Sequence, residues 1–451
     1  MSQTITAASV VARDRDVRRR VLETVLQENH PAVVVDSPPG AGKTHLVETV
    51  VAMAAHHLRM HVGVITPRVE QVHDLVRRLR QSHPFLPIQL LHARGRRPDP
   101  DILADPGVVP VDRPANLRPG PGVVVTTAAK LAFSVPDLWA GQFDLLVCDE
   151  SYQLPWKDLA PVLHLAHRHL LVGDPGQLRP IVRGDLARYE AARHKMHWAA
   201  PRELLRQHPN LSRLALPATW RLPQDTVELV QPSFYPDLPF ASAVALADRQ
   251  LGFAAAGIGD PVDAALDQLA SGATLVGLLL PARPLEVDEV DDEVAELAAH
   301  VVARLLERAA TWIGVRQLTE RDIGYVDAHV ASNARTRARL RATGVGPATM
   351  TTTPEIWQGS QRPVMVAKHT LSGLARLDGF ALDPGRLCVM TSRHQLGVIL
   401  VGRDGVAAAL KCHQHDTAER PSGTEDAQWA GWRAHHSLWA ALDAMGRLIR
   451  I

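Results

Sequence analysis

The stretch SPPGAGKT, residues 37–44, stands between an apolar run at 32–35 and a helix-forming segment at 45–55. This order predicts a strand, a glycine-rich turn and a helix, which is the setting that a phosphate-binding loop requires. Gly40 and Gly42 let backbone N–H groups approach phosphate oxygens because no Cβ stands in the way, and the helix N-terminus adds partial positive charge. The stretch therefore predicts an α/β domain that binds a nucleotide.

The residues predicted to line the phosphates of the nucleotide are consecutive: Pro38, Pro39, Gly40, Ala41, Gly42, Lys43 and Thr44. Lys43 is expected to hold the β- and γ-phosphates and Thr44 a magnesium ion. The usual pattern begins with glycine, whereas this chain has Ser37. A slightly stiffer first turn is therefore expected.

Size and composition limit the classes of protein to which the chain can belong. A length of 451 residues suggests two or three domains at about 150 residues each. A net charge of +1 gives no global attraction to nucleic acid, so any basic surface must be local. No apolar run is long enough to span a bilayer, and no signal core opens the chain, so we expect no membrane contact and a cytoplasmic location.

The three cysteines are far apart and form no CxxC pair, which argues against a disulfide framework or a zinc module. Cys412, His413 and His415 cluster near the C-terminus, but a fourth ligand at suitable spacing is missing. We interpret this cluster as a solvated loop.

In the first half of the chain, short apolar runs alternate with helical patterns. This rhythm indicates a parallel sheet covered on both faces. Beyond 32–35, strands are predicted at 62–65, 89–91, 123–126, 145–148 and 170–172. The interval 94–121 is predicted as a long loop or a small insertion. Its Arg94, Arg96 and Arg97 form either a phosphate-binding patch or an ordinary solvated surface.

The second half repeats the rhythm and predicts a second sheet. Its expected strands are 214–216, 274–280, 323–326, 349–352, 364–367, 387–390 and 398–401, with a helix over 291–312. The predicted domains are 1–211, 212–411 and a C-terminal part, 412–451, made of a flexible segment and an amphipathic helix.

The C-terminal helix is expected to present an apolar stripe of Trp429, Trp432, Trp439, Leu442 and Ile449. Packing against the second domain is the favoured interpretation. Docking to a partner protein is the alternative.

Two further motifs carry chemistry. In LLVCDESYQ, residues 145–153, an apolar strand delivers Asp149 to its carboxyl end, where it can bind magnesium, and Glu150 can orient the attacking water. In LLVGDPGQLRP, residues 170–180, Gln177 follows a strand in a rigid Gly/Pro turn, where its amide could contact the γ-phosphate.

SPPGAGKT, DESYQ and GDPGQLRP, in this order, resemble motifs I, II and III of superfamily 1 helicases. Gln153 after the acidic pair is most similar to the 5′-to-3′ branch that includes the nonsense-mediated-decay helicase. ATWRLP supplies Arg221, WQGS is similar to motif V, and VMTSRH places Arg393 at the arginine of motif VI. The resemblance covers about residues 20–401 and implies two tandem RecA-like domains with a nucleotide held between them.

The resemblance also assigns site residues. Arg221 and Arg393 would stabilise transition-state charge, an effect worth ~10³ to 10⁵ in rate, and Gly359 would touch the nucleotide. The residues implied to contact nucleic acid are Thr66, Pro67, Arg68, Thr127, Lys130, His329, Thr353 and Trp357. For Trp357, base stacking and core packing are open alternatives.

Three departures from the family pattern bear on function. Arg18 to Arg20 occupy the region where a glutamine would read adenine, so preference for ATP is an open point. Gln361 replaces a glutamate of motif V, which weakens an expected ribose contact. Neither domain has a large insertion, so the chain is expected to translocate or remodel rather than unwind efficiently.

The predicted function is a nucleic-acid-dependent ATPase that moves along single-stranded DNA or RNA and resembles 5′-to-3′ helicases. The alternative is an ATP-gated switch that recruits an effector in a repair or defence complex through the C-terminal helix. The sequence leaves the oligomeric state open.

Overall fold

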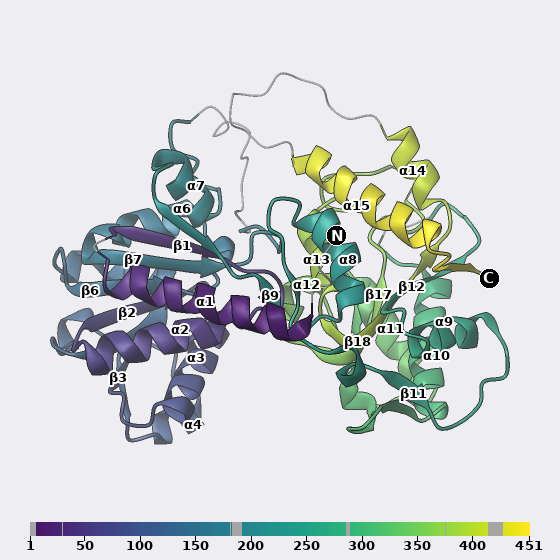
Figure 1. Ribbon diagram of the computed structural model, residues 1–451, viewed down its shortest axis with the longest axis horizontal. Coiled ribbons are helices and arrows are strands. Elements are labelled where there is room, and N and C mark those ends of the chain that lie inside the picture. The colour runs from purple at the N-terminus through teal and green to yellow at the C-terminus, as the bar shows by residue number, and fades with distance from the viewer. Residues whose placement is uncertain are drawn as a thin grey trace. The chain divides into compact units, whose positions relative to one another are not determined.

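The computed structural model describes residues 6–28, 30–180, 182, 192–285, 289–374, 376–413 and 427–451. They form two compact units, each built around a parallel sheet (Figure 1). The first unit comprises Val11–Pro175 and Arg179–Pro217, and the second comprises Ala218–Ile451, Gly176–Leu178 and the residues up to Val10. The predicted α/β class with two mainly parallel sheets is confirmed.

The first sheet has eight strands in the order β4-β3-β5-β2-β6-β7-β1-β8, and every neighbouring pair is parallel. The strands are β1 (Ala32–Asp36), β2 (His61–Thr66), β3 (Ile88–Leu91), β4 (Val108–Val111), β5 (Gly122–Thr127), β6 (Phe143–Cys148), β7 (Ala166–Gly173) and β8 (Ser212–Ala215).

Alternate residues of these strands enter two separate cores, as the two-residue period of a strand requires. In β1, Val33 and Val35 pack on the face covered by α1 (Ala7–Leu26), α2 (Lys43–Ala52) and α3 (Val69–Ser82). Ala32 and Val34 pack on the opposite face, which α5 (Ala128–Ser134), α6 (Trp156–Leu159) and α7 (Ala200–Gln207) cover. Burial on both faces explains why the strands are continuous apolar runs.

Of the two alternatives for residues 94–121, the structure supports a small insertion, since this interval contains α4 (Pro100–Ala104) and the edge strand β4. Helix α1 begins at Ala7, ahead of the first strand. The predicted strand at 214–216 does not open the second sheet, because β8 pairs with β1 of the first.

The second sheet has six strands in the order β16-β15-β17-β18-β12-β19, again all parallel. They are β12 (Leu275–Leu280), β15 (Ile323–Val326), β16 (Met350–Thr352), β17 (Arg362–Lys368), β18 (His394–Arg403) and β19 (Leu448–Arg450). One face packs against α9 (Pro261–Ala270), α10 (Asp292–Glu307) and α11 (Val330–Ala342). The other packs against α8 (Gln224–Phe234), α13 (Pro384–Thr391), α14 (Val406–Cys412) and α15 (Ala427–Ala444). Smaller sheets join β9 (Ala218–Thr219) to β10 (Ala241–Ser242), and β11 (Leu251–Phe253), β13 (Ala310–Trp312) and β14 (Arg316–Gln317).

The second half also differs from expectation at three points. The predicted strand at 387–390 is wrong, because these residues belong to helix α13. The helix predicted over 291–312 ends at Glu307, and Trp312 lies in strand β13. Ile449, expected on the stripe of the C-terminal helix, lies in strand β19.

Helix α15 packs within the second unit. Leu438, Trp439 and Leu442 are buried in a core that also contains Leu229 of α8 and Leu387 of α13. After this helix the chain turns and adds β19 to the sheet beside β12. The favoured interpretation of the stripe, packing against the second domain, is confirmed for these residues. Among the helices in the described ranges, none has the length and apolar character needed to cross a membrane.

Candidate nucleotide site and nucleic-acid surface

The phosphate-binding loop joins β1 directly to α2, as predicted. Gly40 and Gly42 have φ angles of 73° and 76°, in the left-handed region that favours glycine. Gly42 is the N-cap of α2, so Lys43 and Thr44 begin the helix. Pro38, Pro39 and Ala41 are buried and hold the turn against the sheet. This geometry suits a phosphate at a helix N-terminus.

Ser37 takes the place of the usual first glycine without strain. It is not among the residues with positive φ. Its main-chain N–H donates to the carbonyl of Gly173 at 2.9 Å, and its hydroxyl donates to the same oxygen at 3.2 Å. The serine therefore ties the loop to the end of β7.

Arg18 of α1 braces the loop from the other side. Its guanidinium donates to the carbonyl of Ala41 and, at 3.4 Å, to that of Gly42. Asp14, one turn earlier, accepts from Nε of Arg18 at 2.8 Å. Sequence reasoning noted Arg18 only as a basic residue in the region of a missing glutamine, because the pairing spans 23 residues that no motif connects.

The acidic pair follows β6, two strands away from β1 in the sheet. Nζ of Lys43 lies 3.6 Å from Oε1 of Glu150, so the structure brings the loop lysine and the predicted base together. Burial, together with the negative charge of Glu150, raises the pKa of Asp149 to about 7. Ionisation of this buried carboxyl therefore costs free energy, and a bound cation would reduce that cost.

Glu150 has φ 52°, an uncommon left-handed conformation for a residue other than glycine. Its carboxylate accepts from Nε2 of Gln153 at 3.2 Å. Oε1 of Gln153 accepts from Gln71 at 3.3 Å, and Oε1 of Gln71 accepts from the main-chain N–H of Arg68 at 3.1 Å. A hydrogen-bonded chain therefore connects Arg68 to Glu150.

A second network holds the end of β1. Asp36, which is buried, accepts from the hydroxyl of Tyr152 at 2.6 Å and from Nε of Arg213 at 2.6 Å. Tyr152 belongs to the DESYQ motif, so this network fixes that motif beside the phosphate loop. Burial, with the negative charge of Asp36, raises the pKa of Tyr152 well above its usual value. Tyr152 is therefore a neutral donor.

The GDPGQLRP motif is divided between the two units. Asp174 belongs to the first, whereas Gly176, Gln177 and Leu178 pack as part of the second. Leu178 enters a core of the second unit together with Leu387. Gln177 itself is largely buried.

The two predicted arginines lie close together in the second unit. Nε of Arg221 donates to Oε1 of Gln361 at 2.6 Å, and Nη1 donates to the carbonyl of Ser392 at 3.1 Å. Gln361 therefore holds Arg221. Arg393 is 2% exposed, and its Nε and Nη2 have no hydrogen-bond partner among the described residues. Gly359 lies in a nearby exposed turn with φ 85°.

In the first unit, the predicted nucleic-acid residues lie at one edge of the sheet. Thr66 and Thr127 are partners in the register of β2 and β5. Pro67 and Arg68 follow β2. Thr127 caps α5 by accepting from the main-chain N–H of Lys130.

In the second unit, His329 and Thr353 follow the neighbouring strands β15 and β16. The ring of His329 lies 5.0 Å from that of Phe380, centroid to centroid. Trp357 is fully buried, and its Nε1 donates to the carbonyl of Tyr325 at 3.0 Å. Of the two alternatives for Trp357, the structure therefore supports core packing, and the expected base stacking at this residue is not supported.

Among the residues that the structure describes, no group of three His, Cys, Asp or Glu side chains could hold a metal ion. His415 of the C-terminal cluster lies outside the described residues. Mg²⁺ is commonly bound by one or two protein ligands together with substrate phosphates. Thr44 and Asp149 fit that mode, and the raised pKa of Asp149 agrees with a carboxyl that awaits a positive charge.

Residues 16–219 match the family model described as AAA domain. No functionally curated protein matches the sequence. Solved structures with a similar arrangement include the arterivirus nonstructural protein 10 (helicase), at 15% identity, a TM-score of 0.42 and coverage of 84% of this chain and 63% of that chain. Another is the E. coli DExH-box NTPase HrpB, at 12% identity, a TM-score of 0.42 and coverage of 99% of this chain and 50% of that chain. A third is S. cerevisiae Dbp5 bound to RNA and ADP BeF3, at 12% identity, a TM-score of 0.40 and coverage of 99% of this chain and 93% of that chain.

The chain thus spans less than two thirds of the length of the arterivirus helicase. At TM-scores below 0.5, these structural likenesses carry no argument about activity. The sequence match is more specific, because residues 16–219 contain the phosphate-binding loop, the acidic pair and the braces that hold them. This part of the chain is therefore similar to an AAA-type domain.

Proposed function

We propose that this protein is a nucleic-acid-dependent ATPase that moves along single strands in the 5′-to-3′ direction. The observation that carries the proposal is the meeting of Lys43, Asp149 and Glu150 at the carboxyl edge of one parallel sheet, beside a glycine-rich loop in phosphate-binding geometry. Ligands bind at this edge in open α/β sheets.

Each site residue has a proposed task. The loop amides and Lys43 bind the phosphates, and Thr44 and Asp149 would hold Mg²⁺, which neutralises phosphate charge when bound. Glu150, held by Gln153, orients the attacking water. Gln177 senses the γ-phosphate, and Arg221 and Arg393 supply positive charge to the transition state. The buried N–H groups of Arg393 without a protein partner suit an anionic ligand.

We further propose that the strand backbone contacts Thr66, Pro67, Arg68, Thr127 and Lys130 in the first unit, and His329 and Thr353 in the second. Hydroxyl and main-chain groups at strand ends suit phosphate contacts without sequence readout. The chain from Arg68 to Glu150 offers a route by which a bound strand could stimulate hydrolysis.

The alternative, an ATP-gated recruiting subunit, depends on a C-terminal helix that is free to dock. The burial of Trp439 and Leu442 in the second unit weakens that alternative. It would still be favoured by loss of partner binding with intact hydrolysis after a change on the exposed face of α15, such as Trp429→Ala.

The test is phosphate release from ATP by the full chain, alone and with single-stranded DNA, single-stranded RNA or duplexes with 5′ or 3′ tails. We expect single strands to increase the rate, 5′-tailed duplexes to be the better unwinding substrates, and Lys43→Ala and Glu150→Gln to abolish release. The proposal is wrong if no strand stimulates release and Lys43→Ala behaves like the wild type.

A further inference from the structure

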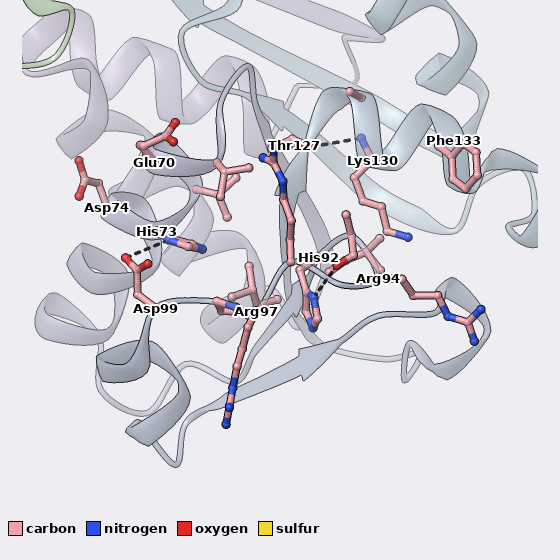
Figure 2. Close-up of a pocket in the computed structure, with 18 of the residues that line it drawn as sticks. Glu70, His73, Asp74, His92, Arg94, Arg97, Asp99, Thr127, Lys130 and Phe133 are labelled. Atoms are coloured by element: carbon pink, nitrogen blue, oxygen red, sulfur yellow. Dashed lines mark hydrogen bonds and ion pairs between the residues drawn. The ribbon is translucent and has the colours of Figure 1, made fainter. Parts of the chain in front are cut away.

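A pocket of about 1070 Å³ opens in the first unit, between α3, the segment after β3 and α5. Figure 2 shows Glu70, Asp74 and Asp99 gathered on one side and Arg94, Lys130 and Phe133 on the other. The volume lies at the upper end of the ~300–1,000 Å³ range of small-molecule sites. The pocket is distinct from the phosphate-binding loop, none of whose residues lines it.

The negative charge on the acidic side of the pocket is partly paired within the protein. Arg77 pairs with Asp101 at 2.6 Å, with Asp74 at 3.4 Å and with Asp99. Asp99 also lies 3.0 Å from Nδ1 of His73. The hydrogen bond from Arg77 lowers the pKa of Asp99, so this carboxylate is ionised and already paired. The carboxylates, Glu70 among them, lie on the side of the pocket away from Arg94 and Lys130, so an anion is expected to bind at the basic side (Figure 2).

The basic side, in contrast, has positive charge to spare. Arg96 and Arg97 are exposed and make no ion pair with any described residue. Arg94 has only Asp112, at 3.8 Å. Nζ of Lys130 contacts a neutral carbonyl, that of Asp112, at 3.3 Å. Four cations therefore stand on this side of the pocket, and Asp112 is the carboxylate that pairs with one of them, Arg94, at 3.8 Å.

The same side carries an exposed aromatic ring. Phe133 is 81% exposed, and Nζ of Lys130 lies 6.0 Å from the centre of its ring. An exposed phenyl ring offers a face on which a planar ligand can stack, and the ammonium group beside it favours an anionic one. Aromatic rings next to cations are how proteins bind unstacked bases, with phosphates on the cations and a base on the ring.

The pocket adjoins the carboxyl ends of β2 and β5. Thr127 and Lys130 line it, and Val69 and Glu70 of its wall directly follow Arg68. A strand that contacts the edge between Thr66 and Thr127 would therefore pass the mouth of the pocket.

We propose that this pocket receives an unstacked base of a single-stranded nucleic acid. Phe133 stacks on the base, and Arg96 and Arg97 bind the phosphates that flank it. The inference rests on the proposed function for the identity of its ligand, and it adds a site that the motifs do not assign. It gives the first unit a grip on one nucleotide, which is a role that the buried Trp357 does not fill.

The test is the affinity of the full chain, without nucleotide, for a fluorescein-labelled decathymidylate and for an oligonucleotide of the same length with an abasic site in place of every base. Phe133→Ala should weaken binding of the intact oligonucleotide by roughly 5- to 100-fold and leave the abasic one unchanged. Phe133→Tyr should keep the affinity. The double variant Arg96→Gln/Arg97→Gln should weaken both by about 10-fold or more and reduce the slope of log K against log salt by about 1.4.

Matched controls lie on the same unit. Phe85, 76% exposed, and Arg78, exposed on α3, do not line the pocket, so Phe85→Ala and Arg78→Gln should bind like the wild type. Equal binding of intact and abasic oligonucleotides by the wild type would overturn base insertion. Equal binding by the double arginine variant and Arg78→Gln would overturn the phosphate contacts, and no binding of either oligonucleotide would overturn the whole proposal.

Measurements on the wild type and on these pocket variants distinguish a failure of this inference from a failure of the proposed ATPase function. If a strand stimulates hydrolysis with the same half-saturating concentration in wild type and pocket variants, the pocket proposal is wrong and the ATPase stands. If the wild type hydrolyses no ATP but shows the expected oligonucleotide affinities, the ATPase proposal is wrong and the pocket stands.

Discussion

At the scale of single residues, the phosphate-binding loop depends on a side chain outside its motif. Arg18 holds the carbonyls of Ala41 and Gly42, and Asp14 orients Arg18. Hydrogen bonds from a charged donor contribute roughly 1.5–3 kcal/mol. Without these hydrogen bonds the phosphate-binding loop would become ordered only when the nucleotide binds. The free energy of ordering the loop would then weaken nucleotide binding.

Arg18→Gln is therefore expected to raise the KM for ATP roughly 10-fold, with a smaller change in kcat. Steady-state phosphate release over a range of ATP concentrations measures both. Arg19→Gln, on the same helix with its side chain 70% exposed, is the control and should leave KM unchanged. Equal KM values for the two variants would contradict a bracing role for Arg18.

Gln71 and Gln153 give a second residue-scale prediction, because they connect Arg68 to Glu150. Gln71→Ala should leave phosphate release without nucleic acid within about 2-fold of wild type, yet reduce its stimulation by a single strand. Gln153→Ala should lower both, since Glu150 then loses its donor. The ratio of stimulated to basal rate at saturating strand is the measurement, and an unchanged ratio for Gln71→Ala would exclude this route.

The catalytic residues of the first unit were predictable because they are local. Lys43, Asp149 and Glu150 each follow a strand at a fixed offset, so the pattern alone places them at one sheet edge. Asp36 and Arg213 were not predictable as partners, because 177 residues separate them. Trp357 could not be assigned from sequence either, because Gly324, whose missing side chain makes room for its ring, is distant in the chain.

At the scale of elements, the short length of an apolar run and an overlooked helix-start signal explain the wrong prediction for residues 387–390. The apolar run at 387–390 has four residues, too few to separate the two-residue period of a strand from the helical period. The deciding signal lies just before it: Asp383 caps α13 by accepting from the N–H of Gly385, and Pro384 occupies the first turn. The prediction for β8 was wrong for another reason. The apolar character of a segment does not indicate which sheet the strand joins.

Helix α15 supplies the prediction at this scale. Trp439 is 3% exposed and packs in the core of the second unit, whereas Trp429 on the same helix is 46% exposed. Trp439→Ala should lower the free energy of unfolding by about 3–5 kcal/mol, and Trp429→Ala by less than about 1 kcal/mol. Urea unfolding measures both. Deletion of 427–451 should give insoluble protein, since it also removes β19; a soluble, active truncation would favour the docking alternative.

At the scale of the whole molecule, buried histidines make the stability of the second unit depend on pH. The second unit encloses His369, His394 and His435, all less than 2% exposed. Burial lowers the pKa of His369 and of His394 to about 3, with a further contribution from Arg221 at His394. Burial, followed by the neighbouring His369, lowers that of His435 well below its usual value. The folded second unit therefore keeps three neutral imidazoles that the unfolded chain would protonate near pH 6.5.

The sign of the pH effect follows from that difference. Because the folded pKa lies below the unfolded one, the stability is fully present above about pH 6.5 and is lost as pH falls from there toward 3. At pH 5.5 each of these histidines lowers the free energy of unfolding by about 1.4 kcal/mol, so the three together remove on the order of 4 kcal/mol relative to pH 8.

Urea unfolding at pH 5.5, 6.5 and 7.5 measures this loss, and hydrogen exchange of β17 and β18 shows whether it arises in the second unit. His435→Leu should remove about a third of the loss that these three histidines cause, because an apolar side chain of similar size takes no proton. His30→Leu, at a side chain 42% exposed, is the control and should leave the pH dependence unchanged. A free energy of unfolding that is constant between pH 7.5 and 5.5 would contradict this prediction. It would show that the imidazoles are protonated or hydrated in the folded state, and therefore that the core around α15 is more open to water than its packing indicates.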